Sequence, residues 1–229
     1  MARPTASAHL LAILLPLLGA PAYAAQPVAL PPPRLDGGAP LMQALSRRAS
    51  SRAFSGRALP RQVLADLLWA ADGVNRPASG MRTAPSAHNR QEVDIYVAMA
   101  DGLYRYDAKG QALIPVTRKD IRALTGRQRF PAHAPLNLVY VVNFARTPGV
   151  PRAAAIEAGA VSTGAVVQNV YLYCASAGLA TVVRGWVDKP ALAKAMGLGP
   201  RQYIVVAQTV VYAAKSTRRE GAKCASLFA

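Results

Sequence analysis

Apolar residues recur at helical spacing in two segments of the first third of the chain. Residues 40–48 are predicted to form a short helix whose apolar face carries Leu41, Met42 and Leu45. A second helix is predicted to open at Pro60 and to end at Asp72-Gly73. Its core face would carry Val63, Leu64, Leu67, Leu68 and Ala71. The polar stretch that follows, up to Gln91, is expected to be a long functional loop.

Extended patterns dominate the middle and the end of the chain. Residues 93–99 and 103–106 predict two strands, with Asp101-Gly102 between them as a hairpin signal. Residues 136–144 are rich in Val and aromatic side chains and predict a strand near the centre of a sheet. Residues 203–213 predict the last strand.

Three more helices are expected between and after these strands. One would run from a cap at Thr117 through Leu124 and end at Gly126. Residues 153–177 are apolar almost all round, which predicts a buried helix, and its polar residues argue against a membrane span. These polar residues are Glu157, Gln168 and Asn169. A last helix would start at Asp188 and stop at Gly197. Helices and strands are mixed along the chain, so an α+β fold is predicted and the sheet need not be parallel.

Length and composition indicate one folded domain behind a leader. The chain has 229 residues, of which 52% are hydrophobic, enough to build a core. Residues 1–25 combine Arg3, an apolar run over residues 10–18 and the small-x-small signal Ala22-Tyr23-Ala24, the pattern of a secretory signal peptide. An uncleaved membrane anchor is the alternative. We therefore expect a periplasmic or secreted protein.

The segment after the leader is rich in proline and glycine. Residues 26–40 hold Pro27, Pro31, Pro32, Pro33, Gly37 and Gly38. Such a composition is typical of a linker that makes no packed element. We therefore expect the folded domain to occupy residues 41–229.

The chain carries a strong excess of positive charge. Lys and Arg number 27 against 11 Asp and Glu, a net charge of +16. Such a net charge is compatible with binding to nucleic acid, to an anionic membrane face or to an anionic surface polymer, or it serves only to keep the protein soluble. The aromatic residues are not interleaved with the basic ones and no nucleic-acid-binding motif is found, so we expect no nucleic-acid partner.

Cysteine and histidine are scarce. Cys174 and Cys224 could pair in an oxidising compartment, but Cys174 lies in an apolar helical run and is expected to pack as a small hydrophobe. The three histidines, His9, His88 and His133, have no close cysteine or histidine partner, so no metal site is predicted.

A cluster of hydroxyl and guanidinium groups gives the first sign of function. Residues 46–52 contain three arginines and three serines. Arginine offers bidentate donors in a fixed fork and serine offers small rotatable hydroxyls, a combination that suits one phosphate group. The alternative is an ordinary basic surface turn at a helix end.

This cluster is followed by other motifs in a recognisable order. Arg48-Ala49-Ser50-Ser51-Arg52 resembles the R-x-S-x-R phosphate motif of the nitroreductase family of flavin mononucleotide (FMN) enzymes. Pro85-Ser86-Ala87-His88-Asn89-Arg90-Gln91 resembles the P-S-x-x-N-x-Q motif that precedes a strand in that family. Residues 157–180 resemble its long central helix, and Arg184-Gly185-Trp186-Val187-Asp188 and the last strand follow. The resemblance covers residues 40–219.

The resemblance implies a nitroreductase-like fold, with a central, mostly antiparallel sheet flanked by helices. It also implies FMN as cofactor. Arg48, Ser50 and Arg52 would hold the phosphate and ribityl chain, joined by basic residues after the last strand. These are Lys215, Arg218 or Arg219, for which a solvated basic tail is the alternative.

The remaining site residues implied by the resemblance would lie near the flavin ring. Asn89 would contact the ring edge or the ribityl hydroxyls, with Ser86 and Gln91 as neighbours that could equally make ordinary loop hydrogen bonds. Gly185 would aim a backbone N–H at flavin N5, and Trp186 would line the ring or simply pack. No catalytic side chain is implied, because the flavin N5 atom performs the chemistry.

Three functions follow as alternatives. The resemblance implies an FMN-dependent oxidoreductase. It also implies a homodimer, because the family builds its flavin sites at the subunit interface. Glu92-Val93 follow Gln91 where many bacterial relatives have Pro-Trp, so the loop is nearer to a subgroup resembling SagB-type dehydrogenases, which leaves the direction of electron flow open. The other functions are a non-catalytic flavin-binding module and a basic exported protein that binds anionic polymers.

Overall fold

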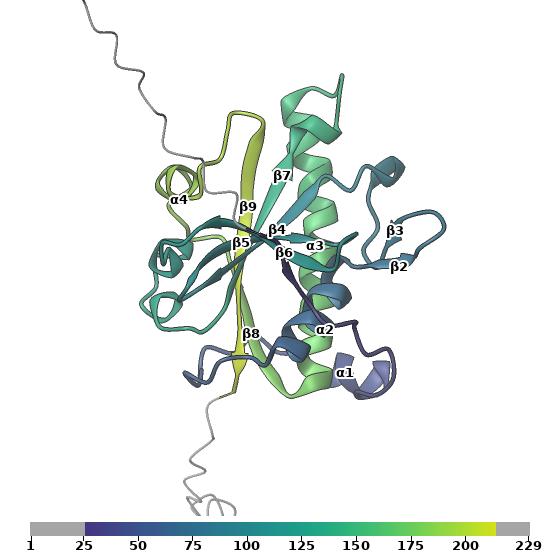
Figure 1. Cartoon of the computed structure of the whole chain (residues 1–229), viewed down its shortest axis with the longest axis vertical. Helices are drawn as coiled ribbons and strands as arrows, with labels where there is room; N and C mark the ends of the chain where they lie inside the picture. The colour runs from purple at the N-terminus through teal and green to yellow at the C-terminus, as the bar shows by residue number, and fades with distance from the viewer. Residues whose placement is uncertain (1–25, 214–229) are drawn as a thin grey trace, which may run out of the picture.

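A seven-stranded antiparallel sheet forms the centre of the protein (Figure 1). The computed structural model describes residues 26–213. The strand order is β1-β6-β5-β4-β7-β9-β8, and each neighbouring pair is antiparallel. The bounds are β1 Val28–Ala29, β4 Val93–Met99, β5 Gly102–Asp107, β6 Ala112–Thr117, β7 Asn137–Asn143, β8 Leu179–Arg184 and β9 Gln202–Tyr212. This sheet confirms the predicted α+β fold.

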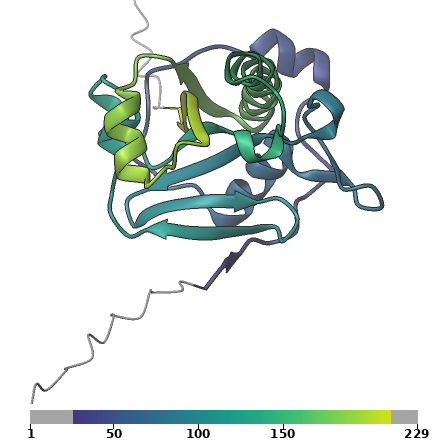
Figure 2. The same ribbon diagram turned by 90° about the horizontal axis from the view of Figure 1, so that it is seen from above.

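Four helices accompany the sheet: α1 Leu41–Arg47, α2 Arg61–Asp72, α3 Arg152–Ala177 and α4 Lys189–Met196. All four were predicted, because each begins near a proline or an Asp cap and carries apolar residues at helical spacing. Short 3₁₀ turns add η1 Ala87–Asn89, η2 Arg122–Thr125, η3 Phe130–Ala132 and η4 Phe144–Arg146. Figures 1 and 2 show α3 and α4 on opposite sides of the sheet.

Strand β7 lies between the two cores of the molecule. Its residues from Leu138 to Val142 are all fully buried, because both faces of the strand are covered. Leu138 and Tyr140 belong to the core shared with α2 and α3, whereas Val139 and Val141 pack with Leu192 of α4. A continuous apolar run is the signature of a strand buried on both faces, which is why its central position could be predicted.

Helix α3 is buried along one face only. Val166, Val170 and Cys174 pack in the core, but Val161 is 74% exposed. The prediction that this helix is buried is therefore wrong for one of its faces, which is exposed in the single chain. None of the helices among residues 26–213 is long and apolar enough to cross a membrane.

Several local predictions were also wrong. Thr117 ends strand β6 rather than capping a helix, and only the 3₁₀ turn η2 follows it. Strand β6 was missed because Pro115 interrupts its pattern, and Pro115 lies at a register shift opposite Tyr104. Strand β8 was missed because its residues continue the apolar run of α3. The loop before Gln91 contains a small hairpin of β2 (Val74–Arg76) and β3 (Met81–Arg82).

The proline-rich segment after residue 25 packs on the domain. Strand β1 pairs with β6, and Leu30 is 8% exposed. Arg34 donates its backbone N–H and its guanidinium to the buried carboxylate of Asp66. The expectation that residues 26–40 make no packed element is therefore wrong, since two extended residues suffice to extend a sheet edge. The predicted signal peptide, residues 1–25, lies outside the described residues.

Candidate functional site

The predicted phosphate motif runs from the end of α1 along the edge strand β8. The Ser51 N–H donates to the Thr181 carbonyl at 2.9 Å, and Ser50 forms a parallel bridge with Thr181. The Ser50 hydroxyl lies 2.7 Å from the Tyr171 hydroxyl, which also accepts a hydrogen bond from the Val183 N–H at 3.0 Å. The motif is therefore held in place by β8 and by one tyrosine of α3.

Arg48 and Arg52 present their charges to solvent beside this anchor. Both residues are exposed, and the Arg48 guanidinium lies 5.4 Å from the centre of the Tyr171 ring. Within residues 26–213, neither forms a salt bridge with a carboxylate. Two uncompensated guanidiniums on an anchored segment are suited to an anion, and this favours the phosphate interpretation over that of a basic turn.

Tyr171 is a site residue that the sequence analysis missed. It is 5% exposed, and its hydroxyl connects the Ser50 side chain to the backbone of β8. Helical spacing marked it only as one apolar residue of α3. The sequence signal that could have found it is its hydroxyl, because a tyrosine buried in a helix usually needs a hydrogen-bond partner for that group.

We expect Tyr171→Phe to loosen the phosphate motif and to cost about 1–2 kcal/mol of unfolding free energy, because the Val183 N–H loses its acceptor. Urea unfolding would measure this cost, and proteolysis within residues 48–52 would report the loosening. Tyr173→Phe is the matched control, since the Tyr173 hydroxyl makes only a 3.4 Å contact to the Val63 carbonyl. Equal stability of Tyr171→Phe and the wild type would contradict this role.

Gly185 and Trp186 follow β8 at the same sheet edge as the phosphate motif. A Cβ built on Gly185 would meet no atom within 4 Å, and Trp186 is 65% exposed. The Trp186 carbonyl accepts from the Arg127 N–H at 3.1 Å, which fixes the turn from a neighbouring loop. Trp186 therefore does not pack into this chain's own core, and the backbone of Gly185 is open to a flat ligand.

The preceding residue, Arg184, anchors this turn from inside the protein. Its guanidinium donates to Thr209 Oγ1 at 2.6 Å and to Asn137 Oδ1 at 3.2 Å. Arg184 is only 5% exposed, and burial lowers its pKa to about 10. Sequence reasoning assigned Arg184 no role, because nothing in the sequence shows that its side chain turns inward.

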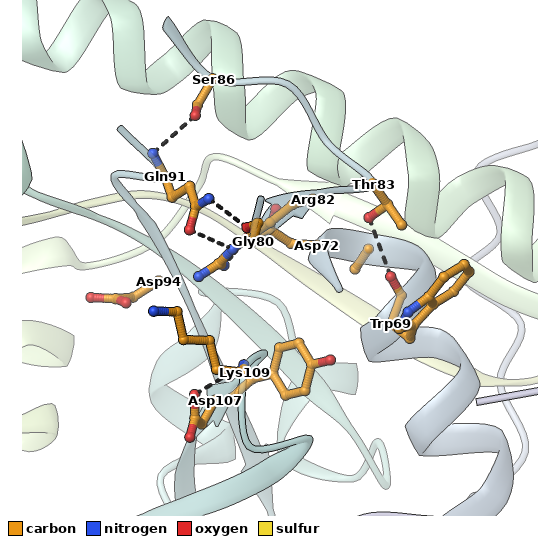
Figure 3. Close-up of polar contacts among 12 residues, drawn as sticks. Trp69, Asp72, Gly80, Arg82, Thr83, Ser86, Gln91, Asp94, Asp107 and Lys109 are labelled. Carbon is orange, nitrogen blue, oxygen red and sulfur yellow. Dashed lines mark hydrogen bonds and ion pairs between the residues drawn. The ribbon is translucent and has the colours of Figure 1, made fainter. Parts of the chain in front are cut away.

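The second motif forms a tight polar loop before β4 (Figure 3). The Gln91 N–H donates to Ser86 Oγ at 2.9 Å. The Gln91 side chain donates to the Gly80 carbonyl at 2.9 Å and to Asn89 Oδ1 at 3.0 Å, and accepts from Arg82 Nε at 3.0 Å. Ser86 and Gln91 thus make the loop hydrogen bonds that were their alternative reading, whereas Asn89 stays exposed.

This loop adopts backbone conformations that are rare for residues other than glycine. His88, Asn89 and Gln91 have φ values of 53°, 52° and 51°. Such positive values persist only where surrounding contacts hold them, and they gather at ligand sites. The hydrogen bonds of Gln91 supply these contacts.

Asp72 lies behind this loop and binds Arg82. It is 5% exposed, and burial raises its pKa to about 6, although the Arg82 guanidinium opposes the shift. A carboxyl whose folded pKa exceeds its unfolded one takes up protons on folding between the two values. Its contribution to stability is therefore fully present below about pH 4 and is lost as the pH rises through about 6.

We expect the unfolding free energy of the wild type, measured relative to Asp72→Asn, to fall between pH 4 and pH 7. Asparagine removes the titration while keeping the shape of the side chain. Urea unfolding of both proteins at each pH would measure the difference. A difference that rises with pH would show that the Arg82 ion pair outweighs burial.

The structure brings some predicted site residues together and separates others. Ser50 and Gly185 both lie along β8, because Ser50 pairs with Thr181 four residues before Gly185. The second motif lies nearer the start of α3, because Glu92, the residue directly after it, accepts a hydrogen bond from Ser162. Ser162 and Tyr171 are about 13 Å apart along the helix axis at 1.5 Å per residue. The predicted phosphate residues Lys215, Arg218 and Arg219 lie outside the described residues.

Comparison with known proteins identifies the fold and its family. The sequence model of the nitroreductase family matches residues 45–212. The chain belongs to the nitroreductase family. This membership, with the antiparallel sheet and its flanking helices, confirms the predicted nitroreductase-like fold and makes the chain an oxidoreductase.

Two relatives named "putative nitroreductase" are similar to this nitroreductase-family chain over most of their length. One, from Methanocaldococcus jannaschii, is 32% identical over 155 residues, which are 63% of this chain and 78% of the relative. The other, a crystal structure from Ralstonia eutropha JMP134, is 43% identical with a TM-score of 0.79. The match covers 84% of this chain and 91% of the Ralstonia chain.

A third structure, from Desulfovibrio desulfuricans, is a complex with FMN. It is 21% identical with a TM-score of 0.56, and the match covers 77% of this chain and 88% of that one. At this identity the likeness shows the fold alone.

Cys174 lies among the described residues, but Cys224 does not. Cys174 is buried in the core, as expected of a small hydrophobe, and burial raises the pKa of its thiol. Cys224 lies outside the described residues, so pairing of the two stays untested. Among residues 26–213, no group of three or more metal-binding side chains comes together.

Proposed function

We propose that this nitroreductase-family protein is an FMN-dependent oxidoreductase that moves two electrons to or from a small organic substrate. The observation that carries the proposal is that Arg48 and Arg52 are exposed and have no carboxylate partner among residues 26–213, on a segment anchored to β8 and Tyr171. A bound flavin would supply two-electron transfer at its N5 atom. The FMN-bound fold relative supports the choice of cofactor.

The residues along β8 are suited to the two ends of the nucleotide. Arg48 and Arg52 would bind the phosphate, and Ser50 would add a hydroxyl whose orientation Tyr171 fixes. Lys215 and Arg218 would join them from beyond the last strand. Gly185 offers an unobstructed backbone to the ring, and the exposed Trp186 offers a flat apolar surface beside it.

A second copy of the chain would complete the site. Asn89 belongs to a separate loop, so it would reach the flavin from the other subunit. The exposed face of α3 supports this arrangement, since it presents small and apolar residues, together with Glu157 and Gln168, where a second helix could pack. Its residues include Ala154, Ala160, Val161 and Gly164. We therefore propose a homodimer.

Export remains part of the proposal. The leader pattern of residues 1–25 favours a periplasmic or secreted protein without a membrane span after cleavage. Because NAD(P)H is chiefly an intracellular donor, such an enzyme would use another reductant or would oxidise its substrate. The Glu92-Val93 pair, which is nearer to the SagB-type subgroup, leaves both directions open.

The absorption spectrum of the purified mature protein tests this function. We expect visible flavin bands and their bleaching under anaerobic conditions by a suitable donor, with NADH and NADPH tried separately. A yellow protein without turnover for any donor and acceptor pair would favour the non-catalytic flavin module. Colourless protein with steeply salt-dependent polymer binding would favour the anionic-polymer alternative.

A further inference from the structure

A second cluster of positive charge surrounds a pocket that borders the loop of Asn89 and Gln91. The pocket has a volume of about 280 Å³ and lies between the start of β4, the end of β5 with its following turn, and η4. Its basic lining residues are Arg82, Arg90, Arg105, Lys109 and Arg146. Its acidic lining residues are Asp94 and Asp107.

The acidic residues of the pocket are already engaged. Asp94 is 5% exposed and accepts hydrogen bonds from Arg146 at 2.7 Å and from Asn143 at 3.2 Å, with Arg105 at 4.0 Å. Asp107 accepts from the backbone N–H of Lys109 at 3.2 Å. Asp72, behind the pocket, forms an ion pair with Arg82. Three carboxylates therefore face five cations, an excess of two positive charges.

The basic residues divide into a fixed inner set and an open rim. Arg82 is held by Asp72 and Gln91, and Arg146 by Asp94 and the Gln91 carbonyl. The side chains of Arg90 and Lys109 form no hydrogen bond or ion pair within residues 26–213. Figure 3 shows the Lys109 side chain extending from the β5–β6 turn toward Asp94.

A bound anion would reduce the repulsion among the cations that line the pocket. Like charges around one small cavity repel one another, and this repulsion is relieved when an opposite charge enters. Guanidiniums bind planar or tetrahedral oxyanions through two donors, and a flexible lysine can close over the bound group. The fixed arginines would therefore orient an oxyanion, and Arg90 and Lys109 would complete its binding.

We propose that this pocket binds the carboxylate or phosphate group of a small anionic molecule. Since Gln91 both lines the pocket and belongs to the loop assigned to the flavin, we assign the anionic molecule to the substrate. This last assignment rests on the proposed function, whereas anion binding itself does not.

Calorimetric titration of the protein with inorganic phosphate and with succinate tests anion binding directly. We expect one of the two probes to bind, and the tighter one identifies the preferred group. Arg90→Gln combined with Lys109→Gln should weaken this binding at least tenfold with unchanged FMN content. Lys119→Gln combined with Lys194→Gln is the matched control, since it removes two exposed cations elsewhere, and it should alter binding less than twofold.

Three results would overturn the proposal that this pocket binds an anionic substrate group. These are no binding of either probe to the wild type, equal weakening in the control, and loss of FMN from the Arg90/Lys109 variant, which would assign the pocket to the cofactor phosphate. A urea midpoint equal to that of the wild type shows that the variant is folded.

Kinetics of the flavin-loaded protein test the assignment to substrate. The Arg90/Lys109 variant should raise the KM for 4-nitrobenzoate at least fivefold and leave that for neutral 4-nitrobenzamide unchanged. Equal effects on both compounds would overturn the substrate assignment. Absence of turnover in a wild type that still binds the anion would instead overturn the proposed function, so the two failures are distinguishable.

Discussion

Replacing Arg48 and Arg52 together by alanine is expected to give a folded protein without flavin. Each charge-assisted hydrogen bond to a phosphate is worth about 1.5–3 kcal/mol, so losing both guanidiniums should weaken FMN binding by a factor of about 100 or more. The fold should tolerate the change, because both side chains are exposed and neither has a carboxylate partner among residues 26–213. The flavin-to-protein absorbance ratio after gel filtration measures the loss.

Arg47→Ala is the matched control for this prediction. Arg47 belongs to the same basic run, but its guanidinium donates to the Gln43 side chain at 3.2 Å from the last turn of α1. We expect this variant to keep its flavin. Normal flavin occupancy in the double variant would refute the phosphate assignment, and equal loss in the control would reduce it to a general effect of charge.

Gly159→Val is expected to destabilise the fold by about 3 kcal/mol or more. Gly159 lies on the buried face of α3, where a Cβ would come within 2.3 Å of Val142 Cγ2 and 2.9 Å of Val142 Cγ1. Val142 is fully buried in the central strand β7 and is branched at Cβ, which makes its side chain stiff at χ1 and hinders it from moving out of the overlap. Helix and sheet would have to separate, which is the cost of overpacking a close-packed interior.

A graded series makes this prediction sharper. Gly159→Ala should cost less than Gly159→Val, about 1–2 kcal/mol, because one methyl overlaps and the helix gains some propensity from alanine. Gly199→Ala is the control, since a Cβ there meets no atom within 4 Å. Urea unfolding would rank the three variants. A stable Gly159→Val protein would contradict the close approach of α3 to β7.

The helices and the buried strand could be predicted because their signals are local. Helix α2 has a proline at its start, an apolar stripe along one face and a glycine after its end. Strand β7 is a continuous apolar run, as expected where both faces of a sheet are covered. The order of motifs from Arg48 to Trp186 was enough to indicate the family.

Other elements depend on partners that are distant in the sequence. Strand β1 has two residues and exists because β6 offers it an unpaired edge. Pro115 hid β6, and the apolar end of α3 hid β8, since neither segment carries a pattern of its own. Only contacts made by the folded sheet decide such cases.

The sequence by itself determined the donor chemistry of residues 46–52, because a run of arginines and serines has donors for an oxyanion in any fold. The tertiary structure decided what supports that chemistry. It set the Tyr171 hydroxyl against Ser50, turned Arg184 inward to anchor the Gly185 turn, and engaged Gln91 in bracing its loop. It also gathered Arg82, Arg105 and Arg146 around one pocket. These contacts join residues far apart in the chain, and only the packing of helices on the sheet brings their side chains within hydrogen-bonding distance.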